Sequence, residues 1–244
     1  MAVFVIPAFN EERNIGRLLA DLESRPALWR DGRVILVDDG SSDGTVAAAL
    51  AHDGELPLEV LRQVPNQGPG RAFDRGFAHA LTFAPDDALI VTLESDTTSD
   101  LDALEEMLAT ARSGTDVVLA SHHDGGALLN VVAHRRFLSK AAAYAIRRGA
   151  GLDARTVSSF FRVYRAAVLR RAYARHGDEF IREAGFACKA EILIKLDRMG
   201  ARVAEVPVSL DWSRREGESK LKLMPTVGGY ARMMVRQAAT RERA

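Results

Sequence analysis

Short apolar runs alternate with longer segments of helical period through the first half of the chain. The apolar runs, which we predict to be strands, are AVFVIPAFN, VILVDD, LEVLRQ, ALIVTLES and DVVLASHH. The segments between them carry apolar residues three or four positions apart, as in ERNIGRLLADLES and PGRAFDRGFAHALTF, and are predicted helices. Because the apolar runs do not alternate with polar residues, both faces of the sheet should be covered. This order predicts an α/β fold in which a mostly parallel, Rossmann-like sheet is flanked by helices.

After Gly126 the pattern becomes less regular. Residues 131–148 and the segment ACKAEILIKLDRMG have helical period, ARVAEVPVSLDW is a further predicted strand, and RREGESK is a predicted polar loop. No internal repeat or low-complexity linker interrupts the chain. We therefore predict a single domain over residues 1–220, with one half at 1–125 and a second half at 126–220.

Residues 221–244 form a separate predicted element, an amphipathic helix with a basic tail. Leu223, Val227, Ala231 and Met234 share one side of this helix, and the arginines lie elsewhere. Such a helix suits peripheral contact with a membrane surface. It equally suits packing on the sheet.

Composition narrows the class of protein. Lys and Arg number 33 and Asp and Glu number 33, so the formal net charge is zero and no nucleic-acid partner is expected. The single cysteine, Cys188, indicates a reducing compartment and should pack as a small apolar residue. No apolar run reaches the roughly 18 residues of a transmembrane span. Since a strand is predicted from Ala2, we expect no signal peptide and a cytoplasmic protein, with the membrane's cytoplasmic face as its surface of contact.

Acidic residues follow three of the predicted strands. Asp38 and Asp39 end the second strand, Asn10-Glu11-Glu12 follows the first, and Glu94-Ser95-Asp96 follows the fourth. Ligands of parallel sheets bind outside the carboxyl ends of the strands, where these carboxylates would repel one another without a cation or a donor-rich ligand. The alternative is that residues 38–43 form an Asx turn that caps the next helix, and for Asp43 we favour that interpretation.

Several segments, taken in order, resemble a known family. PAFNEERN, VDDGSSDGT, NQGPGRAFDRG and ESDTTSD resemble the family 2 glycosyltransferases of GT-A fold. SSFFRVYRAAVL, GFACKAEILIKLDRMGARVAEVPVSL and RREGESKL are similar to the dolichyl- or polyprenyl-phosphate mannosyltransferase branch. The resemblance implies an inverting hexosyltransferase that uses a donor of GDP-mannose or UDP-glucose type and a polyprenyl or dolichyl phosphate acceptor. Residues 1–125 would then bind the nucleotide sugar and residues 126–220 the acceptor.

The resemblance also implies roles for individual residues. Asp39 would hold the base, Gly68 and Gly70 would let the backbone approach the nucleotide, and Asp96 with Glu94 would bind Mg²⁺ or Mn²⁺. The implied donor-binding residues are Pro7, Asn10, Glu11, Asp38, Asp39, Gly68, Gly70 and Glu94. On this basis, Asp39→Ala should abolish donor binding and leave the fold intact.

The sequence departs from the family pattern in the metal-binding segment. Glu94 replaces the usual first aspartate, and Thr98 stands where many relatives carry glutamine. The longer carboxylate can still bind a cation, so a metal site remains the prediction. Because of these departures, the alternative is a protein that binds a nucleotide sugar but has weak catalytic activity.

The acceptor determines which further groups are required. A lipid phosphate is largely ionised near neutral pH and needs cations rather than a general base. Arg162 joins Asp96 as a catalytic candidate, with a structural arginine as the alternative for Arg162. The acceptor-phosphate candidates are Arg136, Ser139, Arg215, Ser219 and Lys220. A soluble hydroxyl acceptor is the runner-up and would require a carboxylate base. The carboxylates available for that role are Asp178, Glu179, Glu183 and Glu191, and none is assigned.

Overall fold

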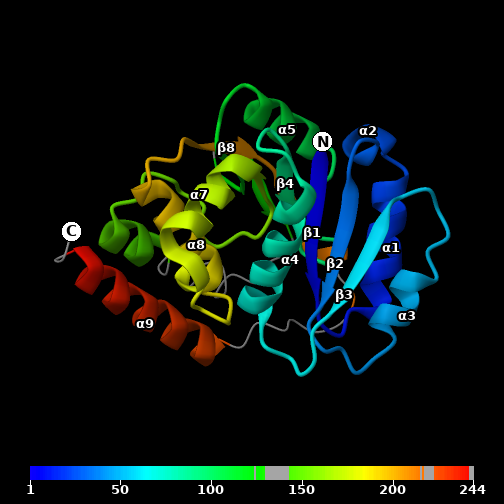
Figure 1. Ribbon diagram of the computed structural model, residues 1–244, viewed down its shortest axis with the longest axis horizontal. Coiled ribbons are helices and arrows are strands. Elements are labelled where there is room, and N and C mark those ends of the chain that lie inside the picture. Colours follow the sequence, from blue (N-terminus) through cyan, green and yellow to red (C-terminus); the bar gives the residue numbers. More distant parts are fainter. Residues whose placement is uncertain (124, 130–142, 215, 217–222, 242–244) are drawn as a thin grey trace.

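A sheet with the strand order β3-β2-β1-β4-β7-β5-β8 forms the centre of the computed structural model, which describes residues 1–123, 125–129, 143–214, 216 and 223–241 (Figure 1). The strands of this sheet are β1 (Ala2–Ala8), β2 (Arg33–Asp38), β3 (Leu58–Arg62), β4 (Leu89–Thr92), β5 (Val117–Ser121), β7 (Arg162–Arg165) and β8 (Val203–Pro207). Strand β7 pairs antiparallel with β4 and β5, and the other neighbours pair in parallel. The predicted α/β fold with a mostly parallel sheet is confirmed.

The prediction of one strand over residues 201–212 is wrong in one respect, because these residues form two strands that belong to two different sheets. β8 ends at Pro207, and β9 (Ser209–Asp211) pairs in parallel with β6 (Ala127–Leu129) outside the main sheet. The chain changes sheet at Val208, whose N–H donates to Ser121 O while its carbonyl accepts from Ala127 N. A continuous extended pattern in the sequence does not show this change of partner.

Helices cover both faces of the main sheet. They are α1 (Glu12–Glu23), α2 (Pro26–Trp29), α3 (Thr45–Leu50), α4 (Pro69–Phe83), α5 (Leu104–Arg112), α7 (Ala166–His176), α8 (Cys188–Arg198) and α9 (Leu223–Arg241), with 3₁₀ turns at Gly177–Glu179 and Trp212–Arg214. Residues 143–150 are also helical. Helices α4, α7 and α8 pack on one face, and α1, α2, α3 and α5 pack on the other.

Successive residues of each central strand enter opposite cores. In β1, Val3 and Val5 belong to the core under α4, whereas Phe4 and Ile6 belong to the core under α1. Both faces of these strands are therefore buried, as their lack of alternation predicted.

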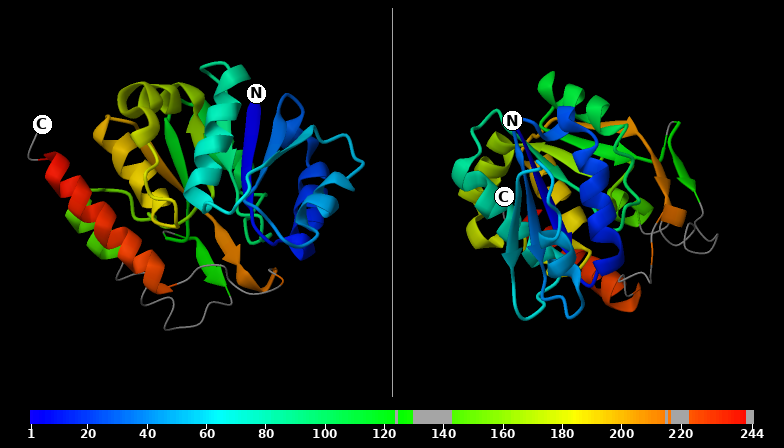
Figure 2. Two further views of the ribbon diagram at one scale, coloured as in Figure 1. Left: turned by 60° about the horizontal axis from the view of Figure 1, so that its bottom comes forward. Right: turned by 90° about the vertical axis from the view of Figure 1, so that its right-hand side faces the viewer.

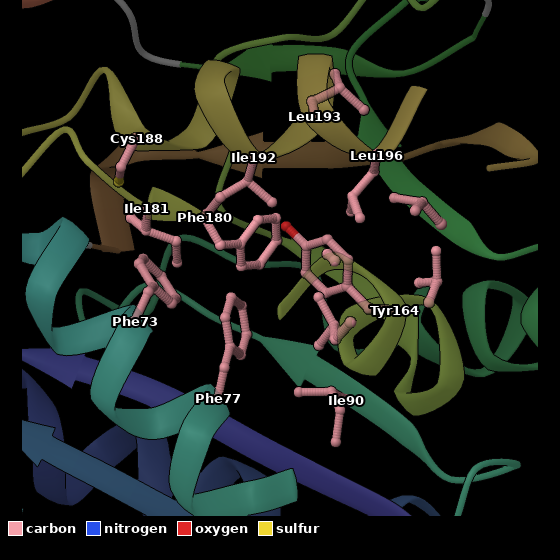
Figure 3. Close-up of a cluster of buried hydrophobic side chains, with 14 of the residues drawn as sticks. Phe73, Phe77, Ile90, Tyr164, Phe180, Ile181, Cys188, Ile192, Leu193 and Leu196 are labelled. Atoms are coloured by element: carbon pink, nitrogen blue, oxygen red, sulfur yellow. The ribbon is translucent and has the colours of Figure 1, made fainter. Parts of the chain in front are cut away.

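The core under α4 is rich in aromatic side chains. Phe73 and Phe77 of α4 face Tyr164 of β7 and Phe180, and the Phe77 and Tyr164 ring centroids are 5.6 Å apart (Figure 3). Cys188 is fully buried at the edge of this cluster, and burial raises the pKa of its thiol to about 12. It is an apolar packing residue, as predicted.

Helix α9 lies along the helical residues 143–150 (Figure 2), where Met234 occupies the space beside Gly149. Its inner side buries Thr226, Gly229 and Met233, while Val227 and Val235 are exposed. Among the described residues, no helix is both long enough and apolar enough to cross a membrane.

Candidate active site

The turns after β1 and β2 are joined by hydrogen bonds. Asn10, which has a left-handed φ of 54°, accepts a hydrogen bond from Ser42 N (2.8 Å) through Oδ1 and donates one from its own N–H to Ser41 Oγ (2.9 Å). Glu11 N donates to Thr45 Oγ1 (2.8 Å). Pro7 lies beside Val37 in the register of the two strands. The structure therefore brings the predicted donor-binding residues Pro7, Asn10 and Glu11 to one edge of the sheet, next to the acidic turn.

Asp39 is buried, and its carboxylate organises the loop that follows β3. Oδ1 accepts hydrogen bonds from Gln63 Nε2 (2.6 Å) and Gln67 N (2.8 Å). Oδ2 accepts from Asn66 Nδ2 (2.9 Å) and Gly68 N (2.8 Å). These four donors give Asp39 a structural role beside the predicted base-binding role, which stays a prediction.

Asp38 and Asp43 have different surroundings. Asp38 is fully buried, and its Oδ1 accepts a hydrogen bond from Ser41 N (3.2 Å). Its Oδ2 has no hydrogen-bond partner within the described structure and lies 3.6 Å from Arg62 Nε. Asp43 Oδ1 accepts from Thr45 N (3.0 Å), so the Asx turn at Asp43 is confirmed. The helix-cap part of that prediction is wrong, because the N-cap of α3 is Gly44, which makes no side-chain cap hydrogen bond.

Gly68 and Gly70 are required by a protein backbone contact. A Cβ at Gly68 would lie 2.5 Å from Ala184 O, and a Cβ at Gly70 would overlap Glu183 O. Gly70 N also donates to Ala184 O (2.7 Å). These glycines let the segment at residues 183–184 pack on the start of α4, and close approach of a nucleotide stays a prediction.

The Gly70→Ala variant is expected to be less stable by about 2 kcal/mol, which lowers Tm by roughly 4–8 °C, because the added methyl group forces two backbones apart. Thermal unfolding would measure this. Gly16→Ala is the matched control, since Gly16 is also helical and has nothing within 4 Å of an added Cβ. That substitution should raise stability by about 0.5–1 kcal/mol. An equal gain in stability in Gly70→Ala and Gly16→Ala would contradict the close backbone contact at Gly70.

The segment after β4 is held in an unusual backbone conformation. Thr97 has φ 63°, a left-handed value that is costly for a β-branched residue. Asp96 is buried, and its Oδ1 accepts hydrogen bonds from Thr98 N (3.2 Å) and Thr98 Oγ1 (2.7 Å). Glu94 is half-buried. Thr98, a departure from the family pattern, thus orients the Asp96 carboxylate.

The described part of the RREGESK segment, Arg214 and Glu216, contacts the acidic segment after β4 (residues 94–98) and helix α1. Thr97 Oγ1 donates to Arg214 O (2.8 Å). Asn14 Nδ2 donates to Glu216 O (2.9 Å), and Glu216 N donates to Asn14 Oδ1 (3.0 Å). The sequence contains no signal for these contacts, which join residues 117 positions apart (Thr97 and Arg214) and 202 positions apart (Asn14 and Glu216). All five acceptor-phosphate candidates, Arg136, Ser139, Arg215, Ser219 and Lys220, lie outside the described residues.

Arg162 is buried under the strand ends. Its Nη1 donates to Lys189 O (2.7 Å) and to Tyr164 Oη (3.3 Å), and its Nη2 donates to Val157 O (3.1 Å). The bond to Lys189 O fixes the start of α8 and the other two tie Arg162 to β7 and to Val157, so the structure gives Arg162 a positioning role. A direct catalytic role stays a prediction.

Lys189 is a residue that sequence reasoning did not single out. It is buried, and its Nζ lies 4.6 Å from the Phe160 ring centroid and 5.5 Å from that of Phe186. Burial lowers the pKa of Lys189, and the charges of Glu94 and Asp96 raise it. The only signal in the sequence was a charged residue in the otherwise apolar first turn of the predicted helix.

Glu183 and Glu191, two of the four carboxylates that were available as a general base, have other partners. Glu191 accepts hydrogen bonds from Arg182 N (2.9 Å), Glu183 N (2.8 Å) and Lys195 Nζ (2.7 Å), while burial raises its pKa. Buried Glu183 pairs with Arg232 and Arg236 of α9. Glu191 therefore fixes the backbone that packs on Gly68 and Gly70.

The mostly parallel sheet, with acidic turns clustered at the carboxyl ends of its strands, has the arrangement expected of a GT-A fold. Residues 3–174 match the family model for "Glycosyl transferase family 2". The chain belongs to this family of glycosyltransferases.

Relatives cover most of the chain. The undecaprenyl-phosphate mannosyltransferase of Micrococcus luteus is 28% identical over 218 residues, which are 89% of this chain and 86% of that protein. The dolichyl-phosphate hexose transferase of Haloferax volcanii is 31% identical over 232 residues, or 93% of this chain and 88% of that protein. The fold is similar to the crystal structure of glucosyl-3-phosphoglycerate synthase from Mycobacterium tuberculosis with Mn²⁺, UDP-glucose and phosphoglyceric acid. The TM-score is 0.66 at 19% identity, covering 99% of this chain and 79% of that chain.

The acidic segment suits a hard divalent cation. Among the described residues, no group of three or more His, Cys, Asp or Glu side chains is arranged to hold a metal ion. Mg²⁺ often takes one or two protein carboxylates and completes its shell with substrate phosphate and water. The two carboxylates of Glu94 and Asp96 fit that mode, in which the substrate supplies the remaining oxygens.

Proposed function

We propose that the chain is an inverting glycosyltransferase that moves a hexose from a nucleotide-diphosphate sugar, of GDP-mannose or UDP-glucose type, to a polyprenyl or dolichyl phosphate. The observation that carries the proposal is the convergence of Glu94 and Asp96, which follow β4, with the turns after β1, β2 and β3 at the carboxyl ends of four neighbouring parallel strands. The names of the two lipid-phosphate glycosyltransferases above support the acceptor class.

Glu94 and Asp96 would hold the Mg²⁺ or Mn²⁺ ion. Such a cation neutralises the charge that develops on the diphosphate leaving group, which makes a protein acid unnecessary. The Thr98 hydrogen bonds keep Asp96 oriented toward that task, and the strained Thr97 fixes the turn. Attack from the face opposite the diphosphate inverts the anomeric carbon.

The acceptor oxygen needs no general base in this scheme. A phosphate monoester has its second pKa near 6 and is largely ionised at neutral pH. This agrees with Glu191, whose carboxylate is occupied by two backbone amides and Lys195. Arg136, Ser139, Arg215, Ser219 and Lys220 remain the proposed acceptor-phosphate groups, because guanidinium and ammonium groups bind phosphate strongly.

Helix α9 is the proposed contact with the membrane surface that carries the acceptor. Val227, Ala231 and Val235 are four residues apart and all exposed, so they form an outward apolar stripe. The opposite side of α9 packs on the protein through Met233 and Gly229. An interfacial helix of this kind places the active site close to a lipid phosphate.

The test is transfer to polyprenyl phosphate presented in detergent and in anionic vesicles, with GDP-mannose or UDP-glucose and with Mg²⁺, Mn²⁺ or chelator. We expect a lipid-extractable glycosyl phosphate of inverted anomeric configuration with one donor, and no product with chelator. Saturating donor, at about 100 times its dissociation constant, should raise Tm by roughly 5–11 °C. Product with only water-soluble acceptors would contradict the acceptor class. A thermal shift without product would favour the catalytically weak binder, and the absence of both would contradict the donor site.

A further inference from the structure

Lys189 places a positive charge inside the protein, next to the acidic segment. It begins α8 with Cys188, is buried, and has its ammonium over the Phe160 and Phe186 rings at 4.6 and 5.5 Å. Arg162 Nη1 holds the Lys189 carbonyl at 2.7 Å, which fixes the first turn of the helix. The cation is thus held by aromatic faces and by a pinned backbone.

Two independent observations place this charge close to Glu94 and Asp96. Thr92 Oγ1 donates to Phe160 O, so the ring under the ammonium is tied to β4 two residues before Glu94. The charges of both Glu94 and Asp96 also act on Lys189, where they raise its pKa against the larger lowering effect of burial. The Arg162 guanidinium, which lowers the pKa of Lys189, belongs to the same cluster, so two cations and two carboxylates share a weakly solvated region.

A fixed positive charge has opposite effects on the two ligands of such a site. It repels a divalent cation that approaches the carboxylates alone, and it attracts the diphosphate of a donor. A cation that arrives with a diphosphate meets less repulsion, because the pair carries a smaller positive charge than the ion. The order in which the ligands bind then depends on Lys189.

We infer that Lys189 is an internal counter-charge that makes divalent-cation binding at Glu94 and Asp96 depend on the donor diphosphate. This inference rests on the proposed function, since it takes Glu94 and Asp96 as the cation ligands. Lys189 is a positioning residue in this role, and it acts on the ligands through its charge. A purely structural lysine that only fills the space between Phe160 and Phe186 would not discriminate between a cation and an anion.

The experiment measures both ligands separately on the full chain. Mn²⁺ binding without nucleotide is followed by the electron paramagnetic resonance of the free ion, and GDP or UDP binding in chelator is followed by calorimetry. In Lys189→Met, the dissociation constant for Mn²⁺ should fall about tenfold and that for the nucleoside diphosphate should rise about tenfold. Lys189→Arg, which keeps a positive charge over the aromatic rings, should stay closer to the wild type than either neutral variant for both ligands.

A control variant separates a local charge effect from the change in net charge. Arg198→Met removes one exposed positive charge from the other end of α8 and should leave both constants unchanged. Lys189→Gln provides a second neutral variant should Lys189→Met fail to fold. Circular dichroism verifies the fold of each variant.

The outcomes distinguish the inference from the proposed function. The inference is overturned if both neutral variants bind Mn²⁺ and the nucleoside diphosphate as the wild type does, or if they bind both ligands more weakly. Either outcome leaves the donor site itself unchallenged. The changes expected of Lys189→Met, if seen in Arg198→Met, also overturn the inference. A wild-type chain that binds neither Mn²⁺ nor a nucleoside diphosphate overturns the proposed function, and the inference with it.

Discussion

The Asp96→Asn variant is expected to lose about three orders of magnitude in kcat while keeping the wild-type fold. The amide oxygen can still accept the hydrogen bonds from Thr98 N and Thr98 Oγ1, so Tm should stay within about 2 °C of the wild type. The charge that binds the cation is lost, and removal of a comparable electrostatic stabiliser costs about 10²–10³ in rate. Steady-state transfer assays over a range of Mn²⁺ concentrations would measure the loss.

Asp100→Asn is the matched control for this prediction, because it removes a carboxylate charge from the same segment. Asp100 Oδ1 accepts hydrogen bonds from Asp102 N (3.1 Å) and Ala103 N (3.3 Å), which an asparagine can also accept. Its kcat should equal that of the wild type. An unchanged kcat in Asp96→Asn would remove Asp96 from the active site.

Replacement of Asp39 by alanine is expected to destabilise the protein by about 3 kcal/mol and to abolish donor binding. The variant leaves four donors, on Gln63, Asn66, Gln67 and Gly68, without their acceptor. A loss of this size lowers Tm by roughly 6–12 °C in a chain of this length. Thermal unfolding and donor titration on the same sample would measure both effects.

The neighbouring residue, Asp38, provides the comparison for the loss of stability. Asp38 accepts one hydrogen bond, from Ser41 N, and its Oδ2 has no hydrogen-bond partner within the described structure. Asp38→Asn should therefore change the stability by less than about 1 kcal/mol. The sequence alone gave the expectation that Asp39→Ala leaves the fold intact, and the hydrogen bonds now predict otherwise. A wild-type Tm in Asp39→Ala would show that water replaces the lost carboxylate without cost.

The pattern of apolar residues predicted the elements of the first half well. Helix α4 spans Pro69–Phe83, as the segment PGRAFDRGFAHALTF indicated, and β2 and β3 begin and end within one residue of their predicted bounds. These elements are local, since period, capping and turn residues all lie within a few positions. The acidic strand ends were equally visible, because parallel strands bring their carboxyl ends to one edge.

The second half was harder to predict because its decisive contacts are distant in sequence. Strand β7 inserts antiparallel between β4 and β5, and residues 201–212 divide between two sheets. Neither the direction nor the partner of a strand is encoded in its own apolar pattern. Both depend on which edge the rest of the chain leaves available.

The sequence by itself determined the α/β class, the mostly parallel sheet, the family and the positions of the acidic residues, since each rests on local pattern or on ordered motifs. Only the tertiary structure decided what those residues contact. It gave Asp39 four internal donors, gave Gly70 the backbone of Glu183 as its neighbour, and brought Lys189 beside Glu94 and Asp96. The physical reason is that the free energy of a buried charge depends on the groups that surround it, and packing brings those groups together from distant parts of the chain.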